Sequence, residues 1–275
     1  MNQFILISAF ALLALLPTHP SSFRAAPGQT RANETAEAVD AGRIVRAFTA
    51  KETQFHRALS NYSFQRDAVI QTIGMGGQIT GEFHRTSRIS FSDSGERFEK
   101  VTFAPPPTLT EIQLTSEDLE DLGGVQPFAL EESKVDQYNF TYAGKEHIDE
   151  LDVYVFDVAP KVLPKKVSER FFQGRVWVDA TDLQIVKVRG KGVPEGNQRF
   201  PIFETYREQI DGKYWFPTYT YADDELVFKG GQTVHLRVKV RYTDYKQYKG
   251  KSKIVEEGEP GAVPPPSPTA PTFKR

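Results

Sequence analysis

The stretch VHLRVKVR, residues 234–241, decides the fold. Its apolar side chains, Val234, Leu236, Val238 and Val240, alternate with the histidine, arginine and lysine side chains between them. A repeat of two residues is that of a β-strand, whose successive side chains point to opposite faces. One apolar and one charged face is typical of an antiparallel sheet that packs one side on a core and leaves the other in water.

Similar stretches precede it along the chain. They are rich in β-branched and aromatic residues, which favour strands, and turn sequences such as 74–77, 93–95 and 211–212 separate them. The expected strands are 62–71, 79–91, 97–103, 138–143, 151–158, 171–178, 183–188, 203–207, 214–221 and 226–228, with 144 and 223–225 as further turns. About ten strands with short connections exclude a parallel sheet with crossover helices and predict a mainly β, α+β domain.

Two segments have the sequence features of helices. Residues 32–60 carry apolar side chains near one stripe of period 3.6, which predicts one amphipathic helix or two shorter ones ending near Ser60. Residues 115–130 begin with the capping sequence TSED and have an apolar side. Pro105–Pro107 precede this second segment and Gly123–Gly124 interrupt it, which predicts a short helical element.

The two ends of the chain differ from its middle. Residues 4–16, FILISAFALLALL, form an apolar run that Pro17 ends, followed by small residues. Thirteen residues are too few to span a bilayer comfortably as a helix, so residues 1–26 are predicted to be a secretory signal peptide, with an uncleaved anchor as the alternative. Residues 249–275 are rich in proline and are predicted to be a disordered tail. The domain between them is expected at 32–248.

Composition excludes several kinds of function. The 34 basic and 36 acidic residues nearly balance, whereas a nucleic-acid partner requires a basic face. The chain has no cysteine, so it has no disulfide, no thiolate nucleophile and no cysteine for lipid attachment. The five histidines lack the spacing of metal ligands, and no nucleophile elbow or phosphate loop is present. We therefore expect no metal, no cofactor and no enzymatic activity; a hydrolase is the less favoured alternative.

Aromatic residues are abundant. The chain has 20 Phe, 11 Tyr and 2 Trp, more rings than one sheet with few helices is expected to cover. An apolar ligand cavity is the natural use for the surplus.

Three stretches together indicate a family. They are LSNYSF at 59–64, which follows the predicted helix; GRVWVD at 174–179 with LQIVK at 183–187; and DGKYWFPT at 211–218. This combination resembles the LolA/LolB type of lipoprotein-sorting domain over residues ~35–248. The resemblance implies a curved, incomplete antiparallel β-barrel whose helices cover the concave side and enclose acyl chains. The chain departs from the LolB type in lacking an N-terminal cysteine, and from the LolA type in its proline-rich tail.

The resemblance and the aromatic content together give a candidate site. Segment 115–130 is expected to be a short helical lid over the concave side. The cavity is expected to be lined by Phe83, Phe91, Leu119, Leu122, Phe128, Tyr154, Phe156, Phe172 and Trp177. The resemblance also implies an inner-strand arginine that latches the lid, with Arg85, Arg88 and Arg97 left as alternatives.

The function expected from the resemblance is that of a non-catalytic periplasmic carrier. It would bind lipid or lipoprotein acyl chains as an exported, soluble monomer, and an envelope protein is a possible partner for delivery. The alternative is an envelope-stress sensor or interaction module that uses the same fold.

Overall fold

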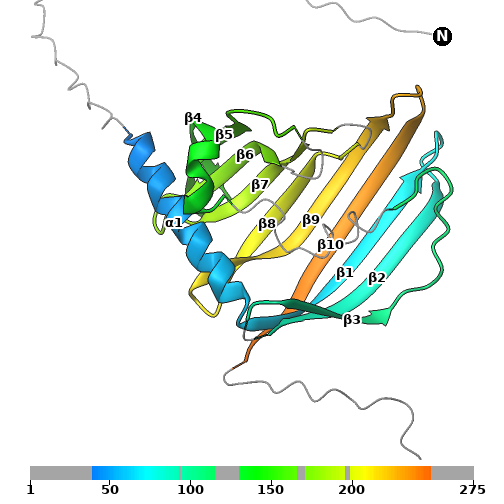
Figure 1. Ribbon diagram of the computed structural model, residues 1–275, viewed down its shortest axis with the longest axis horizontal. Coiled ribbons are helices and arrows are strands. Elements are labelled where there is room, and N and C mark those ends of the chain that lie inside the picture. Colours follow the sequence, from blue (N-terminus) through cyan, green and yellow to red (C-terminus); the bar gives the residue numbers. More distant parts are fainter. Residues whose placement is uncertain (1–38, 93, 115–129, 166–170, 196–198, 249–275) are drawn as a thin grey trace, which may run out of the picture. The chain divides into compact units, whose positions relative to one another are not determined.

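The computed structural model describes residues 39–92, 94–114, 130–165, 171–195 and 199–248. Their main feature is one antiparallel sheet of ten strands in the order β3-β2-β1-β10-β9-β8-β7-β6-β5-β4 (Figure 1). The strands are β1 (Tyr62–Ile73), β2 (Ile79–Phe91), β3 (Arg97–Phe103), β4 (Tyr138–Ile148), β5 (Leu151–Pro160), β6 (Phe171–Asp179), β7 (Ile185–Val193), β8 (Phe203–Ile210), β9 (Tyr214–Val227) and β10 (Thr233–Gln247). The sheet is open because β3 and β4 are its two edges. The predicted fold class is confirmed.

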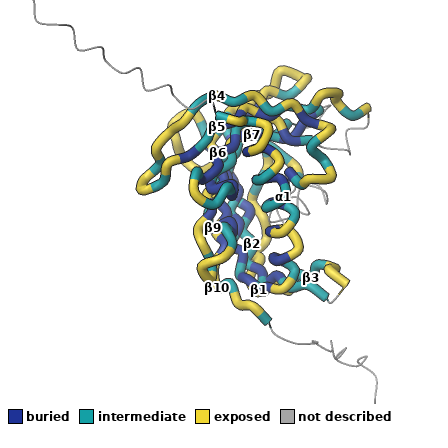
Figure 2. Tube along the Cα trace, turned by 90° about the vertical axis from the view of Figure 1, so that its left-hand side faces the viewer, coloured by how far each residue is buried: buried dark blue, intermediate teal, exposed yellow. Residues whose placement is uncertain are grey.

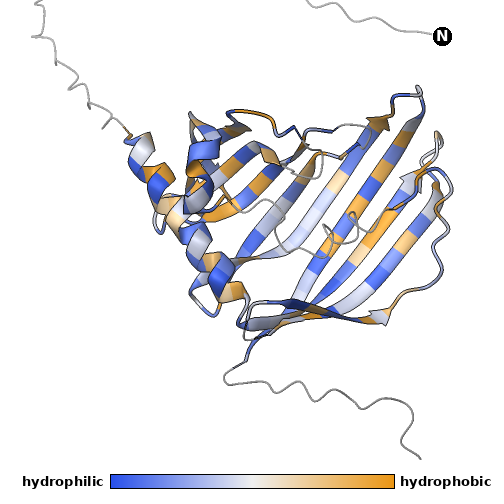
Figure 3. Cartoon of the chain, viewed as in Figure 1, coloured by the Kyte–Doolittle hydropathy of each residue, from blue (hydrophilic) through white to orange (hydrophobic). Residues whose placement is uncertain are grey.

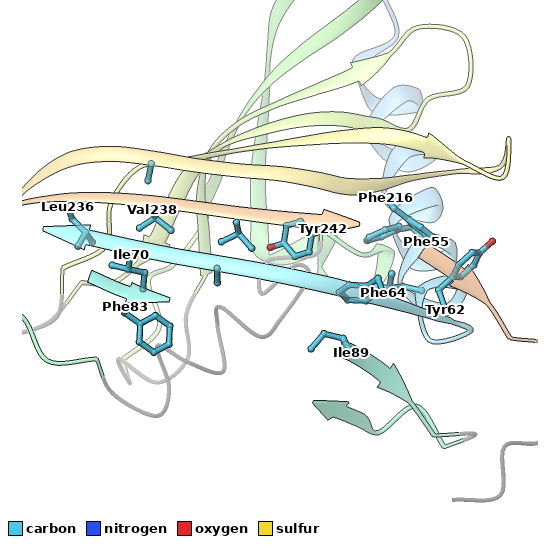
Figure 4. Close-up of a cluster of buried hydrophobic side chains, with 14 of the residues drawn as sticks. Phe55, Tyr62, Phe64, Ile70, Phe83, Ile89, Phe216, Leu236, Val238 and Tyr242 are labelled. Atoms are coloured by element: carbon cyan, nitrogen blue, oxygen red, sulfur yellow. The ribbon is translucent and has the colours of Figure 1, made fainter. Parts of the chain in front are cut away.

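The pairing of β1 with β10 joins two meanders into this single sheet. Ala68 pairs with Val240 and Ile70 pairs with Val238, so the apolar side of each strand lies on the same face. Hydropathy alternates along the strands (Figure 3), and so does burial (Figure 2). The sheet is curved, with β1 and β10 running across the strands of its other end (Figure 4). We call the face that contacts the helix α1 the inner face.

The helix α1 (Ala41–Leu59) lies against the inner face (Figure 1). The Asp40 side chain caps it by accepting a hydrogen bond from the backbone N–H of Arg43 at 2.9 Å. The buried apolar residues of α1 are Ile44, Val45, Phe48, Phe55, Ala58 and Leu59. The prediction of an amphipathic helix is confirmed for this range, and residues 32–38 lie outside the described part of the chain.

Two predicted turns are wrong. The sequence predicts a hairpin tip at 223–225, but β9 continues through these residues. Asp223 accepts a hydrogen bond from Nε of Arg237 at 3.0 Å and also pairs with His235. Basic residues of β10 therefore compensate the charge of this carboxylate, which the sequence analysis expects in a solvent-exposed turn. Gly144 is predicted as a turn but lies inside β4 at a bulge, where its φ of 127° suits glycine.

The predicted lid falls outside the described residues, except for Leu130. Before it, the segment 105–114 lies along β2, where the backbone N–H of Thr108 donates to the carbonyl oxygen of Glu82 at 2.9 Å. After it, a short 3₁₀ helix, η1 (Glu132–Gln137), contacts α1 through a hydrogen bond from the backbone N–H of Glu132 to Oγ1 of Thr53 at 3.1 Å. The sequence does not predict η1.

Candidate functional site

Aromatic rings of α1 close one part of the inner face. The Phe48 ring lies 5.7 Å from the rings of Phe140 and Phe156, and the Phe55 ring lies 5.5 Å from that of Phe216. Phe156 and Phe216 are completely buried. These side chains therefore form the packed core between α1 and the sheet.

A buried ion pair joins α1 to the same region. The two oxygens of Glu52 accept hydrogen bonds from Nη1 and Nη2 of Arg207 at 2.6 and 3.0 Å. Nη1 of Arg207 also donates to the carbonyl oxygen of Ile185, and its guanidinium lies over the Phe55 ring. Both charged side chains are nearly inaccessible to water. This pair fixes the position of α1 on β8.

An apolar cluster continues from Phe55 and Phe216 over the rest of the inner face, on β1, β2, β9 and β10. It includes Ile70, Phe83, Leu236 and Val238, which Figure 4 shows at the end of the sheet away from Phe55 and Phe216. Leu109, Ile112 and Leu114 from segment 105–114 pack against this cluster and remain partly accessible. The row along β10 consists of Val234, Leu236, Val238, Val240 and Tyr242, and all five are buried.

The structure places the predicted cavity residues in separate regions. Phe83 and Phe91 lie on the inner face of β2, where they belong to or pack against the apolar cluster. Tyr154, Phe156 and Phe172 also face inwards, but on β5 and β6, with at least five strands between them and β2. Leu119, Leu122 and Phe128 lie outside the described residues.

Trp177 lies on the opposite, outer face. It pairs with Val155 across β5 and β6, so it points away from Phe156. There it forms a small cluster with Val153, Val155 and Val186, against which Trp215 packs. Its Nε1 donates to Glu146 at 2.7 Å. Trp177 therefore cannot line a cavity on the inner face, and its prediction as a cavity residue is wrong.

The three stretches that carry the family resemblance contact one another. Nε1 of Trp215 donates to Asp182 at 2.8 Å, which joins the stretch at 211–218 to the turn between β6 and β7. The hydroxyl of Tyr62 donates to Asp211 at 3.0 Å. Burial, followed by the neighbouring Asp211 carboxylate, raises the pKa of Tyr62 to about 12. These hydrogen bonds join β1 and the turn between β6 and β7 to the hairpin of β8 and β9.

A polar groove of about 660 Å³ lies on the outer face of β4–β7. Its lining includes Asn139, Gln173 and Arg175, and the guanidinium of Arg175 binds both oxygens of Asp157 at 2.7 and 3.1 Å. Gly174 and Gly190 also line the groove. The charges along this groove do not suit an acyl chain.

The inner face also holds a charged group that the sequence analysis did not single out as a whole. Arg66, which is 1% exposed, donates through Nη2 to Glu99 at 2.7 Å, and the hydroxyl of Ser87 donates to the same oxygen. Arg85 and Arg97 approach Glu99 to 4.0 and 3.9 Å. Loss of hydration lowers the pKa of Arg66; Glu99 opposes this effect, and Arg97 and Arg85 add to it. Arg66 lies between Phe64 and Ala68 in the alternation of β1, so all three side chains share one face. This alternation could have predicted from the sequence that Arg66 faces the core.

Two features are absent from the described ranges. No group of three or more His, Cys, Asp or Glu side chains in these ranges is arranged to hold a metal ion. No helix in the same ranges is long and apolar enough to cross a membrane.

No protein-family model matches the chain, and no curated protein matches it. Solved structures with a similar fold include a DUF1329 family protein from Desulfovibrio piger, at 15% identity over 76% of this chain and 94% of that chain, with a TM-score of 0.40. A LolA superfamily protein from Nitrosomonas europaea has 17% identity over 78% and 99%, with a TM-score of 0.34. An outer membrane lipoprotein-sorting protein domain from Vibrio parahaemolyticus has 12% identity over 74% and 94%, with a TM-score of 0.35. The expected likeness to LolA superfamily proteins is one of fold.

Proposed function

We propose that the chain is an exported, non-catalytic carrier that binds an acyl chain of a lipid or lipoprotein on its inner face. The observation that supports the proposal is the apolar row of β10 with its neighbours on β1, β2 and β9. The side chains of segment 105–114 pack on this row and remain partly accessible, whereas α1 closes the other part of the face. A ligand would enter at the partly accessible end.

The dimensions of the row suit one acyl chain. From Val234 to Val240 the strand advances six residues, or about 20 Å at ~3.3 Å per residue. One leaflet of a bilayer holds its acyl chains within about 15 Å, half of the hydrocarbon core. Each methylene buried contributes about 0.8 kcal/mol. Ordering the ligand and the protein offsets part of this gain, so binding of a single chain would be reversible, as a carrier requires.

A pair of matched substitutions tests the proposal. Phe83→Ala removes a phenylalanine ring beside segment 105–114. Phe156→Ala removes a phenylalanine ring of equal size from the core under α1. The measurement is binding of the neutral fluorescent probe 1-N-phenylnaphthylamine, together with native mass spectrometry of the purified protein for bound lipid. We expect Phe83→Ala to weaken probe binding at least about tenfold, equivalent to 1.4 kcal/mol.

The control separates binding from stability. Phe156→Ala is expected to lower stability by about 3–5 kcal/mol, while the folded fraction binds the probe as wild type does. The proposal is wrong if the wild-type protein binds neither probe nor lipid. Equal loss of probe affinity in the two variants would also contradict it.

A further inference from the structure

We propose that Arg66, Arg85 and Arg97 form a binding site for the anionic headgroup of an amphipathic ligand, either a carboxylate or a phosphate. This inference rests on the proposed function, because it assigns a place to the polar end of a molecule whose acyl chain lies on the inner face. It also narrows the ligand class, since a neutral headgroup would bring no negative charge to Arg85 and Arg97, which lie 4.0 and 3.9 Å from a Glu99 carboxylate that already binds Arg66.

The three arginines come together because of the strand register. Arg66 pairs with Ser87 between β1 and β2, and Arg85 pairs with Ala68. Glu99 pairs with Ile89 between β2 and β3. Paired residues of an antiparallel ladder share a face, so all of these side chains lie on the inner face. Arg97, two residues before Glu99 on β3, lies on the same face.

Charge in this group is not balanced. Arg85 and Arg97 approach the Glu99 carboxylate, which already binds Arg66 at 2.7 Å. Among the described residues, no second carboxylate pairs with Arg85 or Arg97. Within the same ranges, Nε of Arg85 and Nη1 of Arg97 are buried without a hydrogen-bond partner. Buried donors without acceptors are costly, and an anionic oxygen is the acceptor that guanidinium groups bind most strongly.

The surroundings suit an amphipathic molecule better than a free anion. The guanidinium of Arg85 lies 5.3 Å from the centre of the Phe83 ring, which belongs to the apolar cluster. Phe91 pairs with Arg97 and packs against the same cluster. The arginines therefore adjoin the apolar surface on which the acyl chain is proposed to lie. Because β3 is an edge strand, the headgroup would lie at an open edge of the sheet (Figure 1).

The test compares ligands of equal chain length that differ in the headgroup. Laurate, dodecyl phosphate and dodecanol displace the neutral probe 1-N-phenylnaphthylamine from the full chain, and inorganic phosphate is a fourth competitor without an acyl chain. We expect the two anionic amphiphiles to compete at least tenfold more strongly than dodecanol. Inorganic phosphate at the same concentrations is expected to displace no probe and to leave the melting temperature unchanged.

Substitutions then locate the site. Arg85→Gln and Arg97→Gln change side chains that are 24% and 30% exposed, so at least one variant should fold. We define the anion advantage as the affinity for laurate or dodecyl phosphate divided by the affinity for dodecanol. Each variant is expected to reduce this advantage at least fivefold, while its affinity for dodecanol stays within twofold of wild type. Glu99→Gln removes the competing carboxylate and is expected to increase the advantage. Arg88→Gln is the matched control, because Arg88 pairs with Gln65 on the outer face; it should leave the advantage unchanged.

Three results would overturn the inference. Equal competition by dodecanol and the anions excludes a headgroup site but leaves the proposed function intact. An anion advantage that persists in both Arg85→Gln and Arg97→Gln means that the anion binds elsewhere. Stabilisation by inorganic phosphate equal to that by dodecyl phosphate would indicate a site for a free anion. By contrast, failure of every amphiphile and of the probe to bind would refute the proposed function itself.

Discussion

The ion pair of Glu52 and Arg207 provides a quantitative test of how α1 is held on the sheet. Arg207→Met would leave the Glu52 carboxylate buried without its partner, and Glu52→Leu would do the same to the guanidinium. Removal of one member of a buried pair costs about 3–5 kcal/mol. At about 2–4 °C per kcal/mol for a domain of this size, each single variant should melt about 6–20 °C below wild type.

The double variant is expected to be much more stable than the sum of the single changes predicts. Glu52→Leu with Arg207→Met removes both charges and leaves apolar side chains beside the Phe55 ring, on which the guanidinium now lies. Replacement of a buried ion pair by apolar residues is often neutral or stabilising. The coupling energy between the two positions should therefore be at least about 3 kcal/mol in a double-mutant cycle.

Urea unfolding followed by tryptophan fluorescence and circular dichroism measures these free energies. Additive effects, with the double variant losing about the sum of the single losses, would show that the two side chains do not depend on each other for charge compensation. A loss below about 1 kcal/mol in both single variants would place the pair in the range of exposed ion pairs and refute its burial under α1.

Two further predictions concern the packing of the strands. The pKa of Tyr62 is raised to about 12 by burial and by the carboxylate that accepts its hydrogen bond, so its contribution to stability is complete below pH ~10 and is lost as the pH rises through about 12. Wild type should lose about 2–3 kcal/mol more than Tyr62→Phe in urea unfolding between pH 9 and pH 12, and parallel pH curves would contradict the assignment. Gly174→Ala would place a methyl group 2.1 Å from a backbone oxygen of β7 and should lower stability by about 1–3 kcal/mol or more. Gly230→Ala, whose methyl group meets nothing within 4 Å, is the control and should change stability by less than about 0.5 kcal/mol.

The fold was predictable because its signal is local. Alternation such as that of residues 234–241 indicates which face of a strand is buried. Ten strands with short connections are compatible with only a few sheet topologies. The errors at 144 and 223–225 have a different origin. The turn-forming residue types are present there, but Asp223 is compensated by Arg237, which lies on another strand. The sequence gives the type of each residue, but it does not give the residue that pairs with it on a neighbouring strand.

The candidate site was predictable only in part, for the same reason. Strict alternation already puts Phe172 and Trp177 on opposite faces of one strand, so the parity of their positions could have excluded Trp177. The choice among Arg85, Arg88 and Arg97 also follows partly from parity, since Arg85 and Arg88 are an odd number of residues apart. The convergence of the arginines on Glu99 requires the register of β1, β2 and β3, which the sequence does not state.

The residues that identify the fold and those proposed to bind the ligand lie in different places. The recognisable stretches supply contacts such as Tyr62 with Asp211 and Trp215 with Asp182, which hold strands to one another. These contacts hold the strands together whatever headgroup the ligand carries, so they do not select between an anionic and a neutral amphiphile. The arginines and Phe83 lie in β1, β2 and β3, and Arg85, Arg97 and Phe83 are outside all three stretches. If Arg85, Arg97 and Phe83 bind the ligand as proposed, substitutions in β2 and β3 should change this chain's preference between an anionic and a neutral amphiphile and leave the fold intact.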